Sequence, residues 1–399
     1  MRVEIRAARP EEMEEFKRVA STALVMSPAA LVGIQPEWTL CAFEDGKLAT
    51  SYGAWPLTMR FNGEGTAVAG VTMVGTLPIY RRRGYLRKIT VAHFELLHEG
   101  GEQPIAILHA SQAAIYQRYG YAVVSTRNSY SVEPRYLEFP LGRPVPGNFR
   151  EVGDDEFGLL VDLYRRFRAE RIGYVHRGRA MWEAGVLAPP PTGGQLNKVV
   201  YQEDGEPLGY VIYTMDSPQG GGGLGLNQRL TIRDLIWLTP TAYRAVWDYF
   251  AKMDLVSNII WGSVPSDDPL PHLLLEPRML RKTSGDGIMG RIVDVDKALP
   301  RRRYHEEGSL TFEIIDDLCS WNCGRWKLET SADSAVIDRT SDEPQLVMPI
   351  STLAMLVFGQ ISATEAARME RLDVLEHGAL SSWDRVMRTA YRPSCADMF

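Results

Sequence analysis

The stretch Ala67–Arg87 constrains the fold more than any other part of this 399-residue chain. Its first half, Val68–Leu77, is apolar, rich in β-branched residues and interrupted by glycine, which predicts a buried strand. Pro78 has no N–H to donate to a central ladder, so we expect the strand to end before it. From Leu86 onward, apolar residues recur near helical spacing until Gly100, which predicts a helix directly after the strand.

The turn between this strand and this helix contains three arginines and one glycine, Arg81–Gly84. A strand, a basic turn and a helix in that order bring backbone N–H groups and the positive end of a helix to one point, which suits a phosphate group. Gly84 fits such a turn because glycine adopts positive φ and lets an anion approach the backbone closely. The alternative is a solvated arginine cluster ahead of an ordinary amphipathic helix.

Composition argues against several classes of protein. The net charge is −6 and no long basic block is present, so nucleic-acid binding is not expected. No apolar stretch reaches the roughly 18 residues that suggest a membrane span, and the charged N-terminus is unlike a signal peptide. Cys319 and Cys323 lack a nearby histidine or second cysteine pair, so we expect reduced thiols, no bound metal and a cytoplasmic protein.

The first 140 residues predict an α/β unit with a mixed sheet, in which a run of antiparallel strands precedes a β-α-β segment. The expected elements are a strand at Val3–Arg6, a helix from Pro10, strands at Trp38–Ala42, Lys47–Trp55, Leu57–Phe61 and Ala67–Leu77, a helix from Leu86, a strand at Pro104–Leu108, a short helix at Ser111–Arg118 and a final strand at Val123–Val132.

The hexapeptide Arg81–Leu86 (RRRGYL) resembles the R/Q-x-x-G-x-G/A signature of the GNAT (GCN5-related) N-acetyltransferases, with Leu86 in place of the usual Gly or Ala. The resemblance implies that this turn wraps the pyrophosphate of acetyl-CoA. It also implies a bulge near the end of the central strand, whose N–H groups meet the pantetheine arm and the thioester oxygen. The cofactor-binding residues implied are Val74, Gly75 and Thr76 in the strand, and Arg82, Arg83, Gly84, Tyr85, Leu86 and Arg87 in the turn.

A second motif narrows the resemblance. The run His109–Tyr121 (HASQAAIYQRYGY) is similar to the S-x-x-x-I-Y-x-R-F/Y-G-Y helix of the Eis (enhanced intracellular survival) aminoglycoside acetyltransferases. This implies that Tyr116 is the general acid and that Ser111 and Gln112 contact the pantetheine arm. Gln112 stands where the family often has Glu, so a role for that charge is absent. The alternative for Tyr116 is a tyrosine that only packs against its aromatic neighbours.

The rest of the chain fits the same family. Residues 141–289 predict a second αβ unit that lacks an R-x-x-G-x-G/A turn, which implies a degenerate GNAT-like domain that binds no acetyl-CoA. Its glycine-rich segment Ser217–Gly225 links two strands and is expected to be a flexible hairpin loop. Residues 290–399 resemble the sterol-carrier-like domain that closes Eis proteins, where it is a scaffold, and lipid carriage is the alternative.

The chain ends on Phe399, as Eis proteins end on an aromatic residue whose carboxylate reaches the active site. A carboxylate that is ionised at pH 7 is a poor base for an ammonium group, so it is expected to orient the cation or to relay its proton through water. Trp38 and Asp397 are candidates for acceptor binding, because cationic polyamines favour acidic, aromatic pockets.

The resemblance implies an acetyl-CoA-dependent N-acetyltransferase that acts on an aminoglycoside-like or other polyamine substrate and forms a homo-oligomer, as a hexamer. A protein-lysine or small-metabolite acetyltransferase on the same scaffold is the first rival. A catalytically silent acetyl-CoA-binding or lipid-binding protein is the second. The sequence itself does not identify the acceptor amine.

Overall fold

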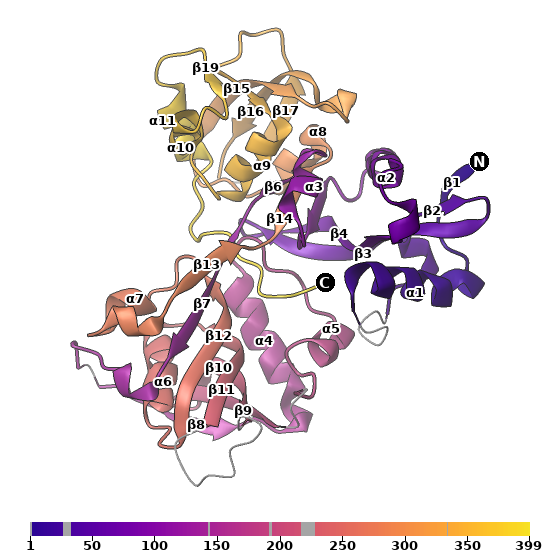
Figure 1. The fold of residues 1–399 in the computed structure, drawn as a ribbon. Coiled ribbons are helices and arrows are strands. Elements are labelled where there is room, and N and C mark those ends of the chain that lie inside the picture. Colours follow the sequence, from indigo (N-terminus) through magenta and orange to yellow (C-terminus); the bar gives the residue numbers. More distant parts are fainter. Residues whose placement is uncertain (1, 27–32, 143, 191–193, 217–227, 333) are drawn as a thin grey trace. The chain divides into compact units, whose positions relative to one another are not determined.

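The computed structural model describes residues 2–26, 33–142, 144–190, 194–216, 228–332 and 334–399. The chain forms two compact units, each built from discontinuous parts of the sequence (Figure 1). Unit 1 comprises Met1–Ser125, Gly287–Ala390 and Phe399, and unit 2 comprises Thr126–Asp286 and Tyr391–Met398. The glycine-rich segment Ser217–Gly225 lies outside the described residues.

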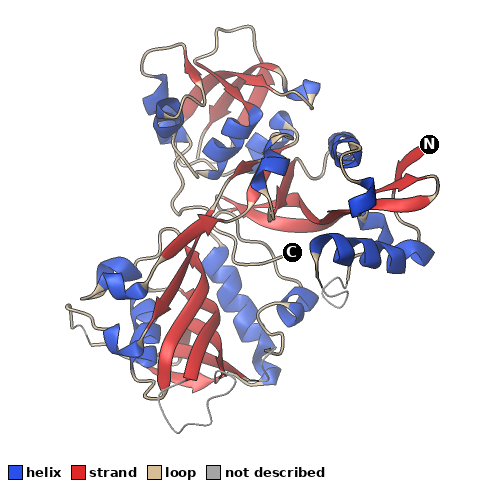
Figure 2. Ribbon diagram, in the orientation of Figure 1, coloured by secondary structure: helices blue, strands red, loops and turns tan. Residues whose placement is uncertain are grey.

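Unit 1 is organised around a seven-stranded mixed sheet with the strand order β1-β2-β3-β4-β5-β14-β6. Helices α1 and α2 cover opposite faces of this sheet, and each seals its own apolar cluster (Figure 2). The strands are β1 Val3–Arg6, β2 Cys41–Glu44, β3 Lys47–Phe61, β4 Glu64–Thr76, β5 Ile105–Leu108, β6 Ala122–Val123 and β14 Met289–Ile292, and the helices are α1 Met13–Leu24, α2 Tyr85–Gly100 and α3 Ala113–Gln117.

The central strand β4 ends at Thr76, before Pro78, and helix α2 follows the turn, which confirms the predicted strand–turn–helix order. β4 is irregular near its end. Tyr52 of β3 is opposed by two residues of β4, Met73 and Val74, and Met73 has a φ of +52°. This is a β-bulge, which bends the strand and increases its twist.

Unit 1 also contains a second, five-stranded sheet with the order β17-β16-β15-β18-β19. Its core is filled by large side chains such as Phe312 and Trp383, whose ring centroids are 5.3 Å apart. The elements are β15 Gly308–Ile315, β16 Gly324–Thr330, β17 Ala335–Arg339, β18 Leu346–Pro349, β19 Asp373–Val374, α8 Val295–Ala298, α9 Ile350–Phe358, α10 Ala363–Arg368 and α11 Ala379–Val386.

Unit 2 contains a seven-stranded sheet with the order β13-β7-β12-β11-β10-β9-β8. Helix α4 packs on one apolar cluster and α6 on another. The elements are β7 Thr126–Val132, β8 Asn148–Glu151, β9 Gln195–Glu203, β10 Glu206–Asp216, β11 Gln228–Trp237, β12 Val256–Pro265, β13 Thr283–Asp286, α4 Phe157–Arg168, α5 Arg179–Ala184, α6 Pro240–Ala251 and α7 Leu270–Leu273.

The predicted final strand Val123–Val132 is wrong as a single element of the first domain. Ala122–Val123 pairs with β14 in unit 1, whereas Thr126–Val132 pairs with β12 and β13 in unit 2. The apolar pattern identifies strand-forming residues, but it carries no information about the partner strand. A local pattern therefore could not reveal that the chain leaves one sheet for the other within a few residues.

The two strands predicted at Lys47–Trp55 and Leu57–Phe61 form one continuous strand, β3. Pro56 lies inside it, opposite Ala69 of β4. β2 pairs with β3 only as far as Thr50, so the strand near Pro56 is an edge on that side and tolerates a missing N–H.

Candidate active site

The central strand β4 extends beyond its parallel neighbour β5 within unit 1. Their register pairs Ala69–Val71 of β4 with Ala106–Leu108 of β5, and β4 continues beyond this point to Thr76. Val74, Gly75 and Thr76, which were predicted to meet the pantetheine arm and the thioester, therefore lie beyond the residues paired with β5. A strand end that has no neighbouring strand on one side suits an extended polar ligand arm.

Two contacts fix the bulge at the end of β4. The Ser51 hydroxyl donates to the carbonyl oxygens of Met73 at 2.9 Å and of Gly75 at 3.3 Å. A Cβ on Gly75 would lie 2.7 Å from the Cβ of Ala23 in α1, so only glycine allows this close helix–strand packing. The bulge is therefore held from the β3 side and from the α1 side.

The basic turn before α2 contains two residues with positive φ. Arg82 has a φ of +64° and Gly84 a φ of +78°, and the 16-residue helix α2 begins directly after Gly84. A left-handed residue followed by a helical one turns successive N–H groups toward one concavity, which favours an anion. A Cβ on Gly84 would meet nothing within 4 Å, so the backbone there is open to a ligand. These residues fit a pyrophosphate group.

The side chains of the predicted turn residues divide into two groups. Arg82 and Arg87 are exposed. Arg83 and Tyr85 instead bind the carboxylate of Glu44, at the end of β2, and Leu86 packs on the apolar cluster beneath α2. Sequence reasoning missed Glu44, because 39 positions separate it from Arg83.

Tyr116 lies on the five-residue helix α3, directly after Ser111 and Gln112, and its side chain is 9% exposed. Its ring meets that of Tyr121 edge-on, with the centroids 6.0 Å apart. Burial, with a smaller contribution from Tyr119, raises the pKa of the Tyr116 phenol to about 12. The phenol therefore keeps its proton at pH 7 and is able to donate it.

The terminal residue Phe399 lies beside β4 at the point where its pairing with β5 ends. The Thr72 hydroxyl donates to its carboxylate at 3.1 Å, and the His109 ring centroid is 5.0 Å from that of Phe399. A Cβ on Gly70 would lie 3.1 Å from the Phe399 ring and 2.5 Å from Leu57. Sequence reasoning missed Gly70, Thr72 and His109. A glycine within a strand of β-branched residues often marks a place where another part of the chain or a ligand approaches the backbone closely.

Tyr116 and Phe399 lie on opposite faces of the sheet near the end of the β4–β5 pairing. Ala69 and Val71 belong to the apolar cluster beneath α2 that includes Tyr116. Gly70, which contacts Phe399, alternates with them along β4 and so points to the other face. A reacting group at this point of the sheet would have a proton donor on one face and a carboxylate on the other.

The two predicted acceptor-binding residues have different surroundings. Trp38 packs against Trp55 with centroids 5.3 Å apart, on the α1 face of the sheet in unit 1. Asp397 is buried in unit 2, where its carboxylate accepts from Arg177 at 2.7 Å and from the Tyr164 hydroxyl at 3.2 Å. Arg177 also pairs with Asp234 at 2.5 Å. This geometry anchors the end of the chain through the Asp397 carboxylate, and the acceptor-binding role of Asp397 stays a prediction.

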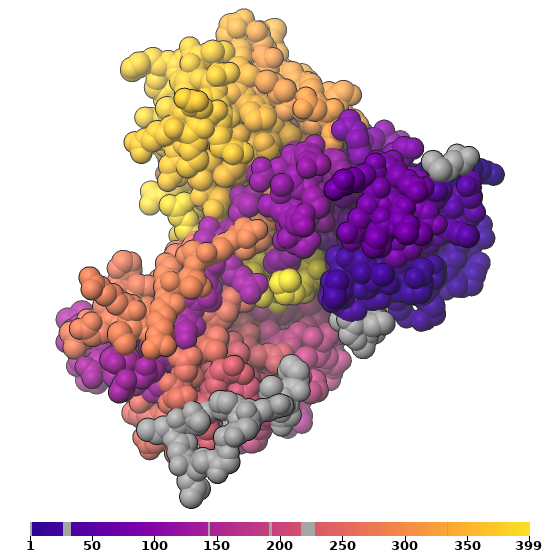
Figure 3. Space-filling view, in the orientation of Figure 1, coloured from indigo at the N-terminus to yellow at the C-terminus, as the bar shows by residue number. Residues whose placement is uncertain are grey.

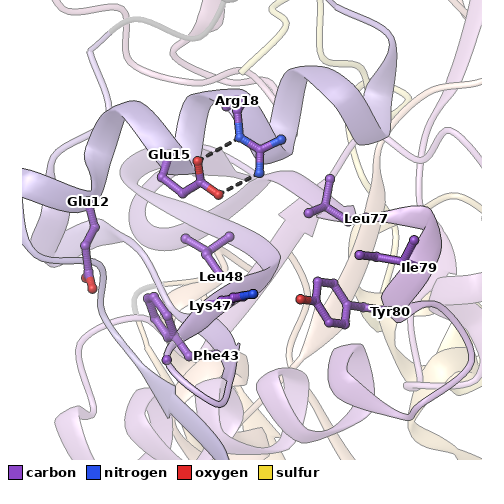
Figure 4. Close-up of a pocket in the computed structure, with 10 residues that line it drawn as sticks. Glu12, Glu15, Arg18, Phe43, Lys47, Leu48, Leu77, Ile79 and Tyr80 are labelled. Atoms are coloured by element: carbon purple, nitrogen blue, oxygen red, sulfur yellow. Dashed lines mark hydrogen bonds and ion pairs between the residues drawn. The ribbon is translucent and has the colours of Figure 1, made fainter.

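A pocket of about 410 Å³ also lies on the α1 face of unit 1 (Figure 4). Its charged lining includes the ion pair of Glu15 with Arg18, and none of its lining residues is one predicted for the site.

On the drawn face, the end of the chain reaches the molecular surface, where its atoms are yellow (Figure 3).

In the part of the chain that the structure describes, no group of three or more His, Cys, Asp or Glu side chains is arranged to hold a metal ion. No helix in the described ranges is long and apolar enough to cross a membrane.

Comparison with known proteins gives three domain matches. Residues 4–124 and residues 173–292 each match an acetyltransferase (GNAT) domain, and residues 295–396 match a sterol carrier protein domain. An uncharacterized N-acetyltransferase of Streptomyces coelicolor is 30% identical over 328 residues, covering 80% of this chain and 78% of that protein. The N-acetyltransferase Eis of Mycobacterium tuberculosis is 29% identical over 360 residues, covering 84% of this chain and 85% of that protein.

A solved structure shows the same arrangement along the whole chain. The crystal structure of Eis1 from Mycobacterium abscessus is 26% identical, covers 100% of both chains and has a TM-score of 0.86. The order of the matched domains, the extension of β4 beyond β5 and the turn before α2 all agree with an acetyltransferase. This chain belongs to the Eis-like family of GNAT N-acetyltransferases, with two GNAT domains followed by a sterol-carrier-like domain.

Proposed function

We propose that unit 1 transfers the acetyl group of acetyl-CoA to an amine of a small polycationic acceptor, such as an aminoglycoside or another polyamine. The observation that carries this proposal is that the Tyr116 phenol and the Phe399 carboxylate lie on opposite faces of the sheet, where the pairing of β4 with β5 ends. Acyl transfer needs a proton donor for the leaving sulfur and a group that manages the proton of the attacking amine. The two faces supply one group each.

The turn before α2 would hold the donor through its pyrophosphate. Backbone N–H groups at the left-handed turn and at the start of α2 favour an anion, and the exposed Arg82 and Arg87 add positive charge. Acetyl-CoA supplies the activated acyl group. Val74, Gly75 and Thr76 would direct backbone N–H groups at the thioester oxygen, so that negative charge on this oxygen is stabilised as the C–N bond forms.

Tyr116 would donate its phenolic proton to the sulfur as the C–S bond breaks. A phenol with a pKa of about 12 is a weaker acid than an ordinary thiol, whose pKa is about 8.5, so full proton transfer would be uphill by roughly 5 kcal/mol. Burial of the sulfur raises the pKa of the thiol and narrows this gap. We therefore assign to the Tyr116 hydroxyl a hydrogen bond to the sulfur, which strengthens as negative charge develops there. The phenolic proton passes to the sulfur only late in the reaction.

The Phe399 carboxylate would act on the acceptor. It lies on the face of the sheet that also carries the Trp38–Trp55 pair, and negative charge beside aromatic rings attracts ammonium groups. The carboxylate orients the cation and passes its proton to solvent through water, because an ionised carboxylate is a poor direct base for an ammonium group. A polycation has further charges to keep it near this site while one amine is neutral.

The proposal extends to the assembly and the compartment. By resemblance to Eis proteins, we propose a homohexamer in the cytoplasm that uses no metal ion. Sedimentation at micromolar concentration tests the assembly, and a stable monomer would contradict it.

A thiol-release assay tests the proposed function. The purified protein is incubated with acetyl-CoA and a panel of polycationic amines, lysine-containing peptides and small neutral or monocationic metabolites, and acetylated products are identified by mass spectrometry. We expect the highest kcat/KM with the polycationic amines and little turnover by Tyr116→Phe. Faster acetylation of peptides or metabolites would overturn the acceptor class, and an absence of thiol release with every amine would overturn the activity.

A further inference from the structure

Glu44 joins two residues of the basic turn to the end of strand β2. Both of its carboxylate oxygens accept hydrogen bonds from Nη1 of Arg83, at 2.6 and 2.8 Å. The Tyr85 hydroxyl donates to the same carboxylate. Glu44 is 8% exposed and Tyr85 3%, whereas the Arg83 side chain is 39% exposed. The carboxylate that accepts these bonds is therefore largely out of water, and its bonds are charge-assisted, which makes them stronger than neutral ones.

The two residues that contact Glu44 lie on either side of Gly84, and each directly follows a residue with a positive φ. Arg83 follows Arg82, with a φ of +64°, and Tyr85 follows Gly84, with a φ of +78°. An L-residue in this conformation is disfavoured and persists only where its surroundings fix it. Arg83 also donates through Nη2 to the Ile79 carbonyl at 3.0 Å, which ties the start of the turn to the same guanidinium. The turn is thus fixed through side chains on both sides of Gly84.

These contacts change the role of Arg83. Its charge is already paired with a carboxylate, and its side chain and that of Tyr85 are directed at Glu44, while the backbone at Gly84 stays open. Phosphate charge would then be met by backbone N–H groups, the start of α2 and other arginines. The resemblance implied that Arg83 and Tyr85 are direct cofactor ligands, and the geometry gives their side chains a supporting position instead.

We propose that Glu44 is a positioning residue that holds the turn in its anion-binding conformation before the acetyl donor arrives. This inference rests on the proposed function, since the anion is taken to be the pyrophosphate of CoA. Glu44 also places a negative charge near that anion, which by itself would weaken binding. The two effects have opposite signs, so a variant that removes the charge while keeping the size decides between them.

The experiment compares two acetyl donors. Acetyl-CoA carries the pyrophosphate, whereas S-acetylpantetheine presents the same thioester without any phosphate. In Glu44→Gln, we expect the ratio of kcat/KM for acetyl-CoA to that for S-acetylpantetheine to fall about tenfold, the loss typical of one charge-assisted contact. Tyr85→Phe should lower the ratio in the same direction by a smaller factor. Glu44→Asp, which keeps the charge, should restore part of the loss.

Glu15→Gln is the matched control, because it breaks another glutamate–arginine pair of unit 1, on α1. An unchanged or increased ratio in Glu44→Gln would overturn the inference, and so would an equal loss with both donors, which indicates a general folding defect. If Glu44→Gln does not fold, Tyr85→Phe carries the same comparison. Calorimetry with CoA and pantetheine repeats the test without turnover, so it also separates this inference from the proposed function, which fails alone if the wild type binds CoA but transfers no acetyl group.

Discussion

Thr72 and Phe399 are joined by a hydrogen bond of 3.1 Å, from the threonine hydroxyl to the carboxylate at the end of the chain, although 327 positions separate them in the sequence. Thr72 is the first residue of β4 beyond the segment paired with β5. The last residue of the chain is thus hydrogen-bonded at the point where β4 extends beyond β5. This contact is the observation that motivates the proposed catalytic role of the carboxylate.

Extension of the chain beyond Phe399 should abolish most turnover. Added residues convert the carboxylate into an amide, which removes the negative charge from the acceptor side. We expect kcat to fall by roughly 10²–10⁴, the range for a positioned acid or base, while acetyl-CoA affinity stays close to that of the wild type. The same residues placed at the N-terminus are the control. A C-terminal tag that leaves kcat intact would refute the carboxylate role but not the acetyltransferase assignment.

Thr72→Val should misplace the carboxylate without removing it. Valine has nearly the same shape as threonine but lacks the hydroxyl that donates to Phe399. We expect kcat to fall by about tenfold, the equivalent of one hydrogen bond to a charged group. Thr72→Ser keeps the donor and should retain most of the activity. Equal kcat values for the serine and valine variants would show that this hydrogen bond does not position the carboxylate.

Tyr116→Phe should lower kcat by roughly 10²–10⁴, since it removes the proton donor and little else. Burial raises the pKa of the Tyr116 phenol to about 12, so the group stays protonated until pH rises toward that value. The wild-type pH–rate profile should therefore show no inflection from Tyr116 below about pH 10, the ordinary pKa of tyrosine. An inflection near neutral pH that disappears in Tyr116→Phe would contradict this assignment. Combined with a C-terminal extension, the variant should lose less than the product of the single losses.

Gly84→Ala should weaken acetyl-CoA binding through backbone conformation alone. Gly84 has a φ of +78° and a Cβ there meets nothing within 4 Å, so no clash contributes. A left-handed L-residue costs about 1–2 kcal/mol, equivalent to a loss of roughly tenfold in affinity if the turn relaxes out of its anion-binding form. Gly84→Val should weaken binding by more than tenfold. Gly100→Ala, at an open position of α2, is the control, and calorimetry measures the affinities.

Asp397→Asn should loosen the end of the chain in unit 2. The Asp397 carboxylate is buried with Arg177, which keeps Asp234 as a partner, so we expect a loss of about 1–3 kcal/mol in the free energy of unfolding. Phe399 follows two residues later, so kcat should fall as well while acetyl-CoA affinity holds. Met398→Leu is the control, because Met398 is 64% exposed. Unchanged kcat in Asp397→Asn would show that the anchor has no bearing on the active site.

The local elements around the proposed donor site could be predicted from the sequence alone. The strand that ends before Pro78, the helix that begins after Gly84 and the glycine in a left-handed turn all follow from short-range rules of backbone geometry. The Tyr116 motif and the terminal Phe399 are likewise visible in the sequence, through their resemblance to a known family. Such features depend only on residues that lie close to each other in the sequence.

The contacts between residues far apart in the chain could not be predicted and follow from the tertiary fold. The contact of Glu44 with Arg83, the hydrogen bond from Thr72 to Phe399 and the burial of Asp397 against Arg177 all join residues far apart in the chain. The division of Val123–Val132 between two sheets has the same origin. Strand partners and buried ion pairs are set by the packing of the whole chain, and hydrophobic periodicity encodes which face of an element is buried but not what covers it.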